Sequence, residues 1–409
     1  MSDVHEAFYG LPEEVKFCKR CVISNQRPSS TVEFKNEKGE KKSVINFSDD
    51  GVCSACIYHE EKETGIDWVS RDEQLRNLLA PFRSNDGSYD IIVPGSGGKD
   101  SAYTAHVLKY KYGMNPLTVT WAPHLYTDIG MKNFQEWMHT GGLDNILYTP
   151  NGKLHREMTK NAFHNLLHPF QPFIVGQRII GPAMAKRFGV KLVMYGENQA
   201  EYGNAIEENS NPIMNMDFFS SEDHLAMKFG GVSMEDYIAE GKYSKDDFAP
   251  YIAPKQQDLI DSGVEVHYLG YYLKWDPQEC YYYAVDNTGF EANPARTEGT
   301  YSKYSSIDDK IDPFHYLTTL IKFGIGRCTY DAAQEVRNGK ITREEAVHLV
   351  KKYDTEFPSK YLKEFLAYID TSEVDFHKVL DAHRSPHIWG KENGIWKLRH
   401  TASSDGIDD

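Results

Sequence analysis

The chain lacks a long apolar run, carries fewer positive than negative charges and contains few cysteines. Each of these shortages excludes a class of protein. No stretch of roughly 18 apolar residues occurs, so a membrane-spanning helix is not expected. The start, Met1-Ser-Asp-Val-His-Glu6, lacks the basic and apolar segments of a signal peptide. Lysine and arginine total 45 against 60 aspartate and glutamate residues, and the net charge of −15 argues against a large nucleic-acid surface. We therefore expect a cytoplasmic protein without a membrane or nucleic-acid partner.

The six cysteines fall into two classes. Four form two Cys-x-x-Cys pairs: Cys18, Cys21, Cys53 and Cys56. The other two, Cys280 and Cys328, stand alone. In a reducing compartment, paired thiols indicate metal ligands before disulfides. Four thiolates leave no coordination position for water, so a structural zinc ion in a ribbon or knuckle with strands at 31–34 and 43–47 is predicted. An iron–sulfur cluster also accepts four cysteines and stays open as the alternative.

A glycine-rich stretch after a short apolar run organises the rest of the sequence. Residues 91–93 are Ile-Ile-Val, as in a strand buried on both faces of a parallel sheet. The glycines of the following loop, 95–98, let backbone N–H groups close around an anion. A helix is predicted from Asp100, so strand, loop and helix N-terminus together form a phosphate site. This is not the Walker loop, because Lys99 precedes Asp100 rather than Ser or Thr.

Strands and helices alternate on both sides of this loop. Further strands are predicted at 117–121, 145–149 and 191–195, with helical patterns between them. This order predicts an α/β fold with a doubly wound parallel sheet. Ligands of such sheets bind beyond the carboxyl ends of the strands. The glycine loop, the turn at 120–123 and the turn at 196–199 are therefore expected around one crevice.

Changes in pattern divide the chain into five expected segments. They are an N-terminal arm with the four-cysteine zinc module at 1–66, a phosphate-loop α/β domain at 67–200, an aromatic-rich insertion over the crevice at 201–311, a helical region at 312–400 and a disordered acidic tail at 401–409. In the helical region, Thr342 and Glu345 form the pattern of a capping box.

Several phrases together carry a resemblance to a known family. Ser96-Gly-Gly-Lys-Asp-Ser101 resembles the pyrophosphate loop of the ATP pyrophosphatase (PP-loop) superfamily. The accompanying phrases are Cys18-Lys-Arg-Cys-Val22, Asp50-Gly-Val-Cys-Ser-Ala-Cys56, Tyr195-Gly-Glu-Asn198, Leu269-Gly-Tyr-Tyr-Leu-Lys-Trp-Asp276, Ile321-Lys-Phe-Gly-Ile-Gly-Arg327, Arg337-Asn-Gly339 and Thr342-Arg-Glu-Glu-Ala346. In this order they resemble the bacterial N-acetyl sugar amidotransferases of surface-polysaccharide and pseudaminic or legionaminic acid biosynthesis, over residues 15–390.

The resemblance implies an ATP-dependent ligase of lipopolysaccharide O-antigen or related glycan biosynthesis. It would convert the acetamido group of an activated N-acetyl sugar to an acetamidino group, with release of AMP and pyrophosphate. An amide oxygen is a poor leaving group, and adenylation turns it into AMP, which ammonia can displace. The catalytic burden is then to stabilise phosphate charge, by loop N–H groups, Lys99 and Mg²⁺.

The expected site residues follow from this chemistry and from the crevice. Lys99, Asp100 and Glu197 are the predicted catalytic residues, and Asp100 is also the predicted Mg²⁺ ligand. ATP contacts are predicted for Ser96, Gly97, Gly98, Lys99, Asp100, Ser101 and Thr120. Glu197 either binds Mg²⁺ or orients the incoming nitrogen, with an ordinary surface turn as the alternative. Arg327 and Asn198 are predicted to hold the sugar substrate, and a structural ion pair is the other interpretation of Arg327.

The sequence contains no pattern of a glutaminase. Such an enzyme needs an activated cysteine at a mature N-terminus or on a strand-to-helix elbow. Residue 2 is serine, and Cys280 and Cys328 lack an elbow pattern, so both are expected to be buried, inert thiols. A separate glutaminase subunit is therefore predicted, and the resemblance points to one like the glutaminase of histidine biosynthesis.

Two other functions compete with the amidotransferase. A tRNA-thiolating sulfurtransferase can combine a pyrophosphate loop with cysteine pairs, but it needs a persulfide-forming or cluster-binding thiol arrangement near the loop and a basic face. A non-enzymatic zinc scaffold would leave the intact loop without a purpose.

Overall fold

A computed structural model describes residues 5–29, 42–202 and 211–403. Its centre is a parallel sheet of five strands in the order β3-β2-β1-β4-β7. The strands are β1 (Ile91–Pro94), β2 (Pro116–Trp121), β3 (Asp144–Tyr148), β4 (Leu192–Tyr195) and β7 (Glu265–Tyr268). Ile92 of β1 pairs with Leu117 on one side and with Val193 on the other. The predicted parallel α/β sheet is confirmed.

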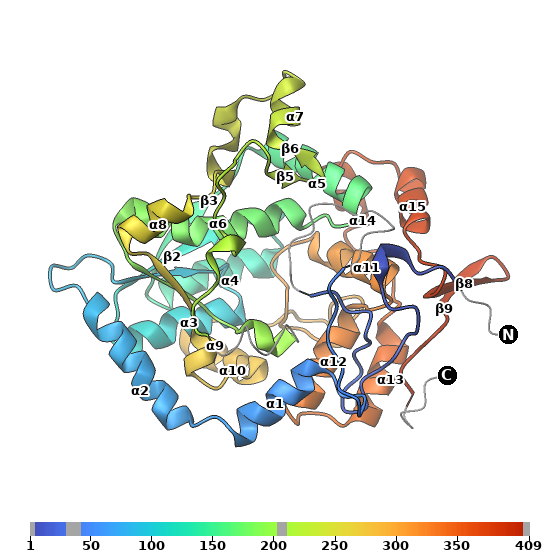
Figure 1. Ribbon diagram of the computed structural model, residues 1–409, viewed down its shortest axis with the longest axis horizontal. Coiled ribbons are helices and arrows are strands. Elements are labelled where there is room, and N and C mark those ends of the chain that lie inside the picture. The colour runs from blue at the N-terminus through green and yellow to red at the C-terminus, as the bar shows by residue number, and fades with distance from the viewer. Residues whose placement is uncertain (1–4, 30–41, 203–210, 404–409) are drawn as a thin grey trace.

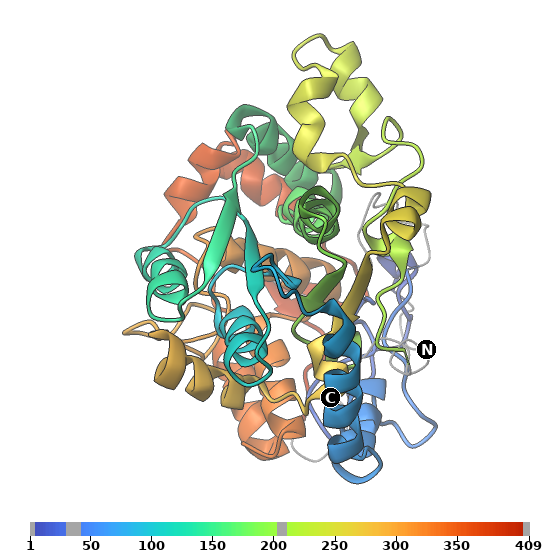
Figure 2. The same ribbon diagram turned by 90° about the vertical axis from the view of Figure 1, so that its left-hand side faces the viewer.

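Helices cover both faces of the sheet (Figures 1 and 2), so its central strands β1 and β2 are buried on both sides. The helices around the sheet are α2 (Trp68–Leu79), α3 (Lys99–Tyr110), α4 (Asp128–His139), α5 (Gly152–Leu166), α6 (Gln171–Phe188) and α10 (Pro277–Thr288). Ile91 and Val93 point toward the α3 side, and Ile92 points toward the α6 side, as the two-residue period of a strand requires. This packing fixes the loop between β1 and α3 at the carboxyl edge of the sheet.

Residues 201–311, which were predicted to form an insertion over the crevice, also contribute a strand to the sheet. Strand β7 pairs in parallel with β4, with Val266 opposite Val193, and becomes the fifth strand. Its four residues, Glu-Val-His-Tyr, lack the β-branched run that marks β1, which is why the sequence did not predict it. This segment also contains η5 (Met216–Phe218), β5 (Lys228–Phe229), β6 (Val232–Ser233), α7 (Met234–Ala239), η6 (Lys245–Tyr251), α8 (Gln256–Ser262) and α9 (Leu269–Tyr272). Part of it, around α7, projects at the top of Figure 1.

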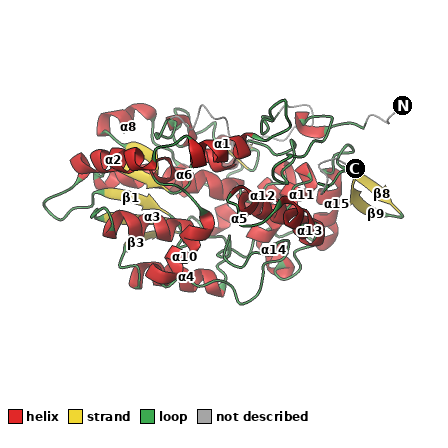
Figure 3. Cartoon of the chain, turned by 90° about the horizontal axis from the view of Figure 1, so that it is seen from below, coloured by secondary structure: helices red, strands yellow, loops and turns green. Residues whose placement is uncertain are grey.

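The C-terminal part is helical, as predicted. Its helices are α11 (Asp312–Phe323), α12 (Arg327–Arg337), α13 (Arg343–Tyr353), α14 (Leu362–Tyr368) and α15 (Glu373–Ala382). The capping box at α13 is confirmed, since Thr342 and Glu345 bond each other's backbone N–H groups. A hairpin of β8 (Trp389–Glu392) and β9 (Ile395–Leu398) was not predicted. Figure 3 shows the sheet toward one end of the molecule and these elements toward the other. Of the predicted disordered tail, Ala402 is buried, and residues 404–409 lie outside the described part.

The N-terminal cysteine module packs onto these C-terminal helices. We use this name for the described residues 5–29 and 42–66, which include η1 (Phe8–Gly10) and α1 (Ser54–Thr64). Val22, Ile23 and Ile45 share one hydrophobic cluster with residues of α11 and α12. The predicted strand at 31–34 lies outside the described residues, and 43–47 forms only isolated bridges.

A buried ion pair ties the cysteine module to the turn after β4. Lys62 Nζ of α1 lies 3.0 Å from Glu201 Oε1, in the short helix η3 (Gln199–Tyr202), and both side chains are under 5% exposed. Lys62 also donates to the carbonyl of Trp275 at 2.8 Å. The module is thus joined to the sheet edge where the crevice was predicted. None of the helices in the described residues combines the length and the apolar content that a membrane span requires.

Candidate functional site

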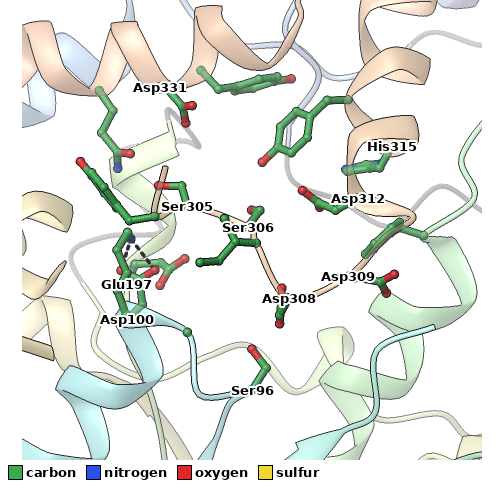
Figure 4. A pocket seen from close by; sticks show the side chains of 18 of the residues that line it. Ser96, Asp100, Glu197, Ser305, Ser306, Asp308, Asp309, Asp312, His315 and Asp331 are labelled. Carbon is green, nitrogen blue, oxygen red and sulfur yellow. Dashed lines mark hydrogen bonds and ion pairs between the residues drawn. The ribbon is translucent and has the colours of Figure 1, made fainter. Parts of the chain in front are cut away.

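A cavity of about 580 Å³ lies where the sheet, the C-terminal helices and the cysteine module meet (Figure 4). The glycine loop forms one wall, together with Glu197 from the turn after β4. The segment 304–312, which we call the strap, crosses the cavity and leads into α11. Helix α12 and four residues of the cysteine module close the other side. The volume is in the range of small-molecule sites.

Contacts with strand β2 and with helices α3 and α4 set the conformation of the glycine loop. The Gly95 N–H donates to the carbonyl of Val119 at 3.0 Å, and the Gly97 N–H donates to Ser101 Oγ at 3.2 Å. Gly97 has φ +82°, and a Cβ there would lie 2.8 Å from the Cα of Phe134. Glycine is therefore required at 97, both by its backbone conformation and by the approach of α4. Helix α3 begins directly after the loop, which points its N-terminus at the cavity.

Lys99 and Asp100 form an ion pair at the start of α3. Lys99 Nζ lies 2.7 and 2.5 Å from the two carboxylate oxygens of Asp100. Burial lowers the pKa of Lys99, but the neighbouring Asp100 carboxylate raises it, and the net shift is upward. Lys99 therefore keeps its charge although its side chain is only 8% exposed. Both residues line the cavity, with Glu197 beside Asp100 in Figure 4.

Four of the residues predicted to contact ATP or the sugar do not line this cavity. The hydroxyl of Ser101 bonds within the loop, where it accepts from the Gly97 N–H. Thr120 is fully buried, and its hydroxyl accepts a hydrogen bond at 2.9 Å from an amide side chain of β3. Asn198 is 2% exposed, and its Oδ1 accepts from a backbone N–H two residues along the chain. Arg327 is also 2% exposed and lies behind the wall.

Arg327 forms the structural ion pair that was its alternative interpretation. It donates to Asp312 Oδ2 at 2.7 Å and to the carbonyl of Ser305, and its guanidinium lies 4.6 Å from the ring centroid of Tyr316. It thus holds the strap against α11. The sequence offered no means of choosing between this role and a substrate contact.

The strap brings three carboxylates to the cavity that the sequence did not single out. Asp309 accepts from both the backbone N–H and Nδ1 of His124, each at 2.7 Å, which fastens the strap to the loop after β2. Burial raises the pKa of Asp308, and a hydrogen bond from Ser96 of the glycine loop opposes that shift. Burial also raises the pKa of Asp312 to about 7, although the Arg327 guanidinium lowers it. These residues lie more than 200 positions from the glycine loop, so only the fold shows their proximity.

Helix α12 presents one face to the cavity. Tyr330, Ala333, Gln334 and Arg337 line it, at the spacing of one helical face. Arg27 of the cysteine module also lines it, and its guanidinium lies 5.7 Å from the ring centroid of Tyr330. Neither arginine was predicted as a site residue from the sequence. Arg337 appeared there only within a family phrase, and that phrase was the one available signal.

The four paired cysteines come together in the folded module. Cys18 Sγ lies 3.8 Å from Cys56 Sγ, and Cys21 Sγ lies 3.7 Å from Cys53 Sγ. All four sulfur atoms lie within 4.8 Å of one another, and all four residues are buried. Backbone N–H groups of Arg20 and Cys53 point at Cys18 Sγ at 3.4 and 3.3 Å, as befits a thiolate. The predicted four-cysteine metal site is therefore assembled.

The two single cysteines are buried, as predicted. Cys280 is 2% exposed and Cys328 is fully buried. Burial raises the pKa of both thiols. A thiol that stays protonated at neutral pH is a weak nucleophile, so neither has the character of a glutaminase nucleophile.

Crowding at Gly95 leads to a first testable prediction. A Cβ at this position would lie 2.2 Å from the Cβ of Ser101, so Gly95→Ala must displace the loop. A displacement near 1 Å in a site that positions reacting atoms costs on the order of 100-fold in rate. We expect Gly95→Ala to lower AMP formation by about that factor. The matched variant Gly98→Ala, whose Cβ would meet nothing closer than Ser96 Oγ at 3.7 Å, should lose far less. Equal losses in both variants would show that the loop conformation is not what matters.

The C-terminal part of the chain matches a known family of proteins. Residues 298–402 match the family model described as "LPS biosynthesis protein WbpG-like, C-terminal domain". This region holds the strap and all of α11 to α15. Residues 298–402 are therefore similar to the C-terminal domain of WbpG-like lipopolysaccharide biosynthesis proteins, and the resemblance found in the sequence is confirmed for this part.

Other similarities are more distant. An uncharacterized protein of Methanocaldococcus jannaschii is 28% identical over 78 residues, which are 19% of this chain and 27% of that protein. The match thus spans about a quarter of the relative. Among solved structures, the NH3-dependent NAD synthetase of Campylobacter jejuni is 14% identical, covering 32% of this chain and 56% of that one, with a TM-score of 0.26. The U34-tRNA thiolase NcsA of Methanococcus maripaludis with its [4Fe-4S] cluster is 14% identical over 83% and 97% of the chains, with a TM-score of 0.28. Scores this low support no assignment of function.

Proposed function

We propose that the protein is an ATP-dependent amidotransferase that converts the acetamido group of an activated N-acetyl sugar to an acetamidino group. The observation that carries the proposal is the cavity itself. A loop built to bind phosphate opens into a space whose opposite walls are the WbpG-like C-terminal domain and the cysteine module. ATP at the loop would leave the rest of the cavity for a second, smaller substrate.

The reaction balances with ATP and ammonia as the only co-substrates. The amide oxygen attacks the α-phosphorus of ATP, the bond between that phosphorus and the bridging oxygen breaks, and pyrophosphate leaves. Ammonia then attacks the carbon of the adenylated imidate, and AMP leaves with the former amide oxygen. The product is an amidine, which is protonated at neutral pH because the positive charge is shared between two nitrogens.

The residues of the cavity suit these steps. The loop N–H groups and Lys99 would stabilise the charge that develops on the departing pyrophosphate. Asp100, 32% exposed beside the loop, fits the role of a Mg²⁺ ligand. Mg²⁺, when bound, would neutralise part of the phosphate charge. Asp312, whose pKa burial raises to about 7, would accept the proton that ammonia loses.

We assign the four-cysteine site to a single zinc ion with a structural role. With Zn–S bonds of about 2.3 Å, the edges of a tetrahedron of sulfur atoms measure about 3.8 Å. The separations of 3.7 and 3.8 Å between Sγ atoms match this value. An iron–sulfur cluster would place its own iron and sulfide atoms between the thiolates and hold them farther apart.

The ammonia would come from a separate glutaminase subunit. Burial of Cys280 and Cys328 supports this, since neither thiol can be reached as an acylation site. We expect the purified chain to use ammonium salts but not glutamine. The measurement is AMP formation with each nitrogen source at equal concentration. Glutamine hydrolysis by this chain alone, abolished by substitution of Cys280 or Cys328, would contradict the prediction.

The test of the reaction is incubation with ATP, Mg²⁺, ammonium and a panel of acetamido sugars, including sugar nucleotides, followed by mass spectrometry. Replacement of the amide oxygen by NH lowers the mass by about one unit and gives a group that is cationic at neutral pH. AMP and pyrophosphate should appear in equal amounts with the product. AMP formation that requires tRNA instead would favour the sulfurtransferase. That alternative needs a persulfide-forming or cluster-binding thiol arrangement near the loop. Cys280 near the loop is buried, and the four-cysteine site is assigned above to zinc.

A further inference from the structure

Most of the ionisable side chains that line the cavity are acidic. Its carboxylates are Asp100, Glu197, Asp308, Asp309, Asp312 and Asp331. They come from the loop, the turn after β4, the strap and the N-terminal ends of α11 and α12. Lys99 is already paired with Asp100. An anionic substrate other than Mg²⁺-bound ATP would be repelled there, and the net charge of −15 adds to the repulsion.

Two arginines, Arg27 and Arg337, line the same cavity. Arg337 lies at the C-terminal end of α12, and its one hydrogen bond among the described residues goes to the backbone carbonyl of Glu201 at 3.1 Å. No carboxylate of the described part forms a salt bridge with it, and a guanidinium has five N–H donors. Arg27 reaches the same face of α12 from the cysteine module, beside Tyr330. Residues 330 and 337 are two turns apart, or roughly 10 Å along the helix axis.

We propose that Arg27 and Arg337 form an anion subsite that binds the phosphate or carboxylate group of the sugar substrate. The inference rests on the proposed function, and it gives the cysteine module a second role. Arg27, Ile23 and Ile45 of the module are themselves part of the cavity wall. The metal would then shape the sugar end of the site as well as hold the module together.

The geometry also gives the substrate a direction. Its anionic group lies between the module and α12, and its acetamido group extends toward the glycine loop, where the α-phosphate of ATP is held. Planar guanidinium groups suit both phosphate and carboxylate, because each can accept two parallel hydrogen bonds. A neutral N-acetyl sugar would lack these contacts.

Equilibrium binding tests the subsite without depending on turnover. The probes are UDP-N-acetylglucosamine for a diphosphate, N-acetylneuraminic acid for a carboxylate and N-acetylglucosamine as the neutral sugar. Each is titrated into the full chain with Mg²⁺ and α,β-methylene-ATP, which blocks the α–β cleavage. The wild type should bind at least one anionic probe with an affinity roughly 10-fold or more above that for the neutral sugar. This is the gain in affinity that a charge-assisted hydrogen bond provides. Which probe binds identifies phosphate or carboxylate as the source of the anion.

Two substitutions then locate the binding. Arg27→Gln and Arg337→Gln should each lower the affinity for the anionic probe roughly 10- to 100-fold, as expected for the loss of a charge-assisted hydrogen bond. The affinity for α,β-methylene-ATP should stay within about twofold of the wild-type value. Arg337→Lys should restore part of the affinity. The matched control is Arg20→Gln, which removes an exposed charge paired with Glu60 from the same module and should change neither affinity.

Four results would overturn the subsite. The first is the absence of tight binding by either anionic probe, and the second is unchanged probe affinity in both variants. The third is an equal loss of ATP-analogue affinity. The fourth is loss of bound metal with unchanged probe affinity, which would make the arginines counter-ions of the thiolates. Binding that follows the subsite, combined with no AMP formation from any acetamido sugar, would instead refute the proposed reaction and leave the subsite standing.

Discussion

Lys99→Ala and Asp100→Ala are expected to abolish AMP formation while the fold stays intact. Removal of Lys99 takes away the buried charge at the start of α3, next to the N–H groups that would face phosphate. Loss of one such preorganised electrostatic contact typically costs about 100- to 1,000-fold in rate. Asp100→Ala removes the partner of Lys99 and the expected Mg²⁺ ligand together. Rates are measured as AMP release with saturating ammonium and sugar.

The control for these variants is Lys111→Ala, at the other end of the same helix. Lys111 is exposed, pairs with Asp72 at 3.3 Å and does not line the cavity. It should keep near wild-type activity. Circular dichroism should be similar in all three variants, because none of these side chains belongs to a hydrophobic cluster. Thermal unfolding should fall most in Asp100→Ala, which leaves the buried Lys99 charge without its partner. Turnover near the wild-type rate in Lys99→Ala would show that the glycine loop is not the ATP site.

Loss of the metal is expected to unfold the cysteine module and to remove sugar binding with it. Structural zinc sites supply on the order of 10 kcal/mol of folding free energy to segments that lack a core of their own. Cys56→Ala should lower the melting temperature, reduce bound zinc from one ion per chain to none, and abolish activity. Cys280→Ala, a buried cysteine outside the module, should retain one zinc ion.

Elemental analysis decides this prediction. One zinc per wild-type chain is expected, and the zinc should be lost in step with activity as a chelator is added. Iron with labile sulfide would contradict the zinc assignment. Full activity in metal-free protein would contradict the role of the module in shaping the cavity.

The glycine loop could be predicted from sequence because its signals are local. The apolar strand, the glycines and the helix that begins at Lys99 are contiguous, and each has its own physical pattern. The cysteine site could also be predicted from the sequence, since four thiols of that spacing have few other uses. In both cases the chemistry lies within a short stretch or in a residue type that is rare in this chain.

The far walls of the cavity could not be predicted in this way. The strap lies some 200 residues after the loop, and its tie to His124 depends on the fold alone. Arg27 and Arg337 are ordinary arginines in sequence, and they become significant only when the module packs on α12. Arg327 stands beside a glycine and was open to two interpretations, and only its burial and its pairing with Asp312 decide between them.

The fate of the amide oxygen can be followed with an isotope label. An acetamido sugar labelled with ¹⁸O in its carbonyl group is incubated with the protein, ATP, Mg²⁺ and ammonium. If ATP adenylates that oxygen, each AMP formed carries one ¹⁸O atom in its phosphate, and pyrophosphate carries none. Unlabelled AMP, or the label in inorganic phosphate released together with ADP, would contradict the account.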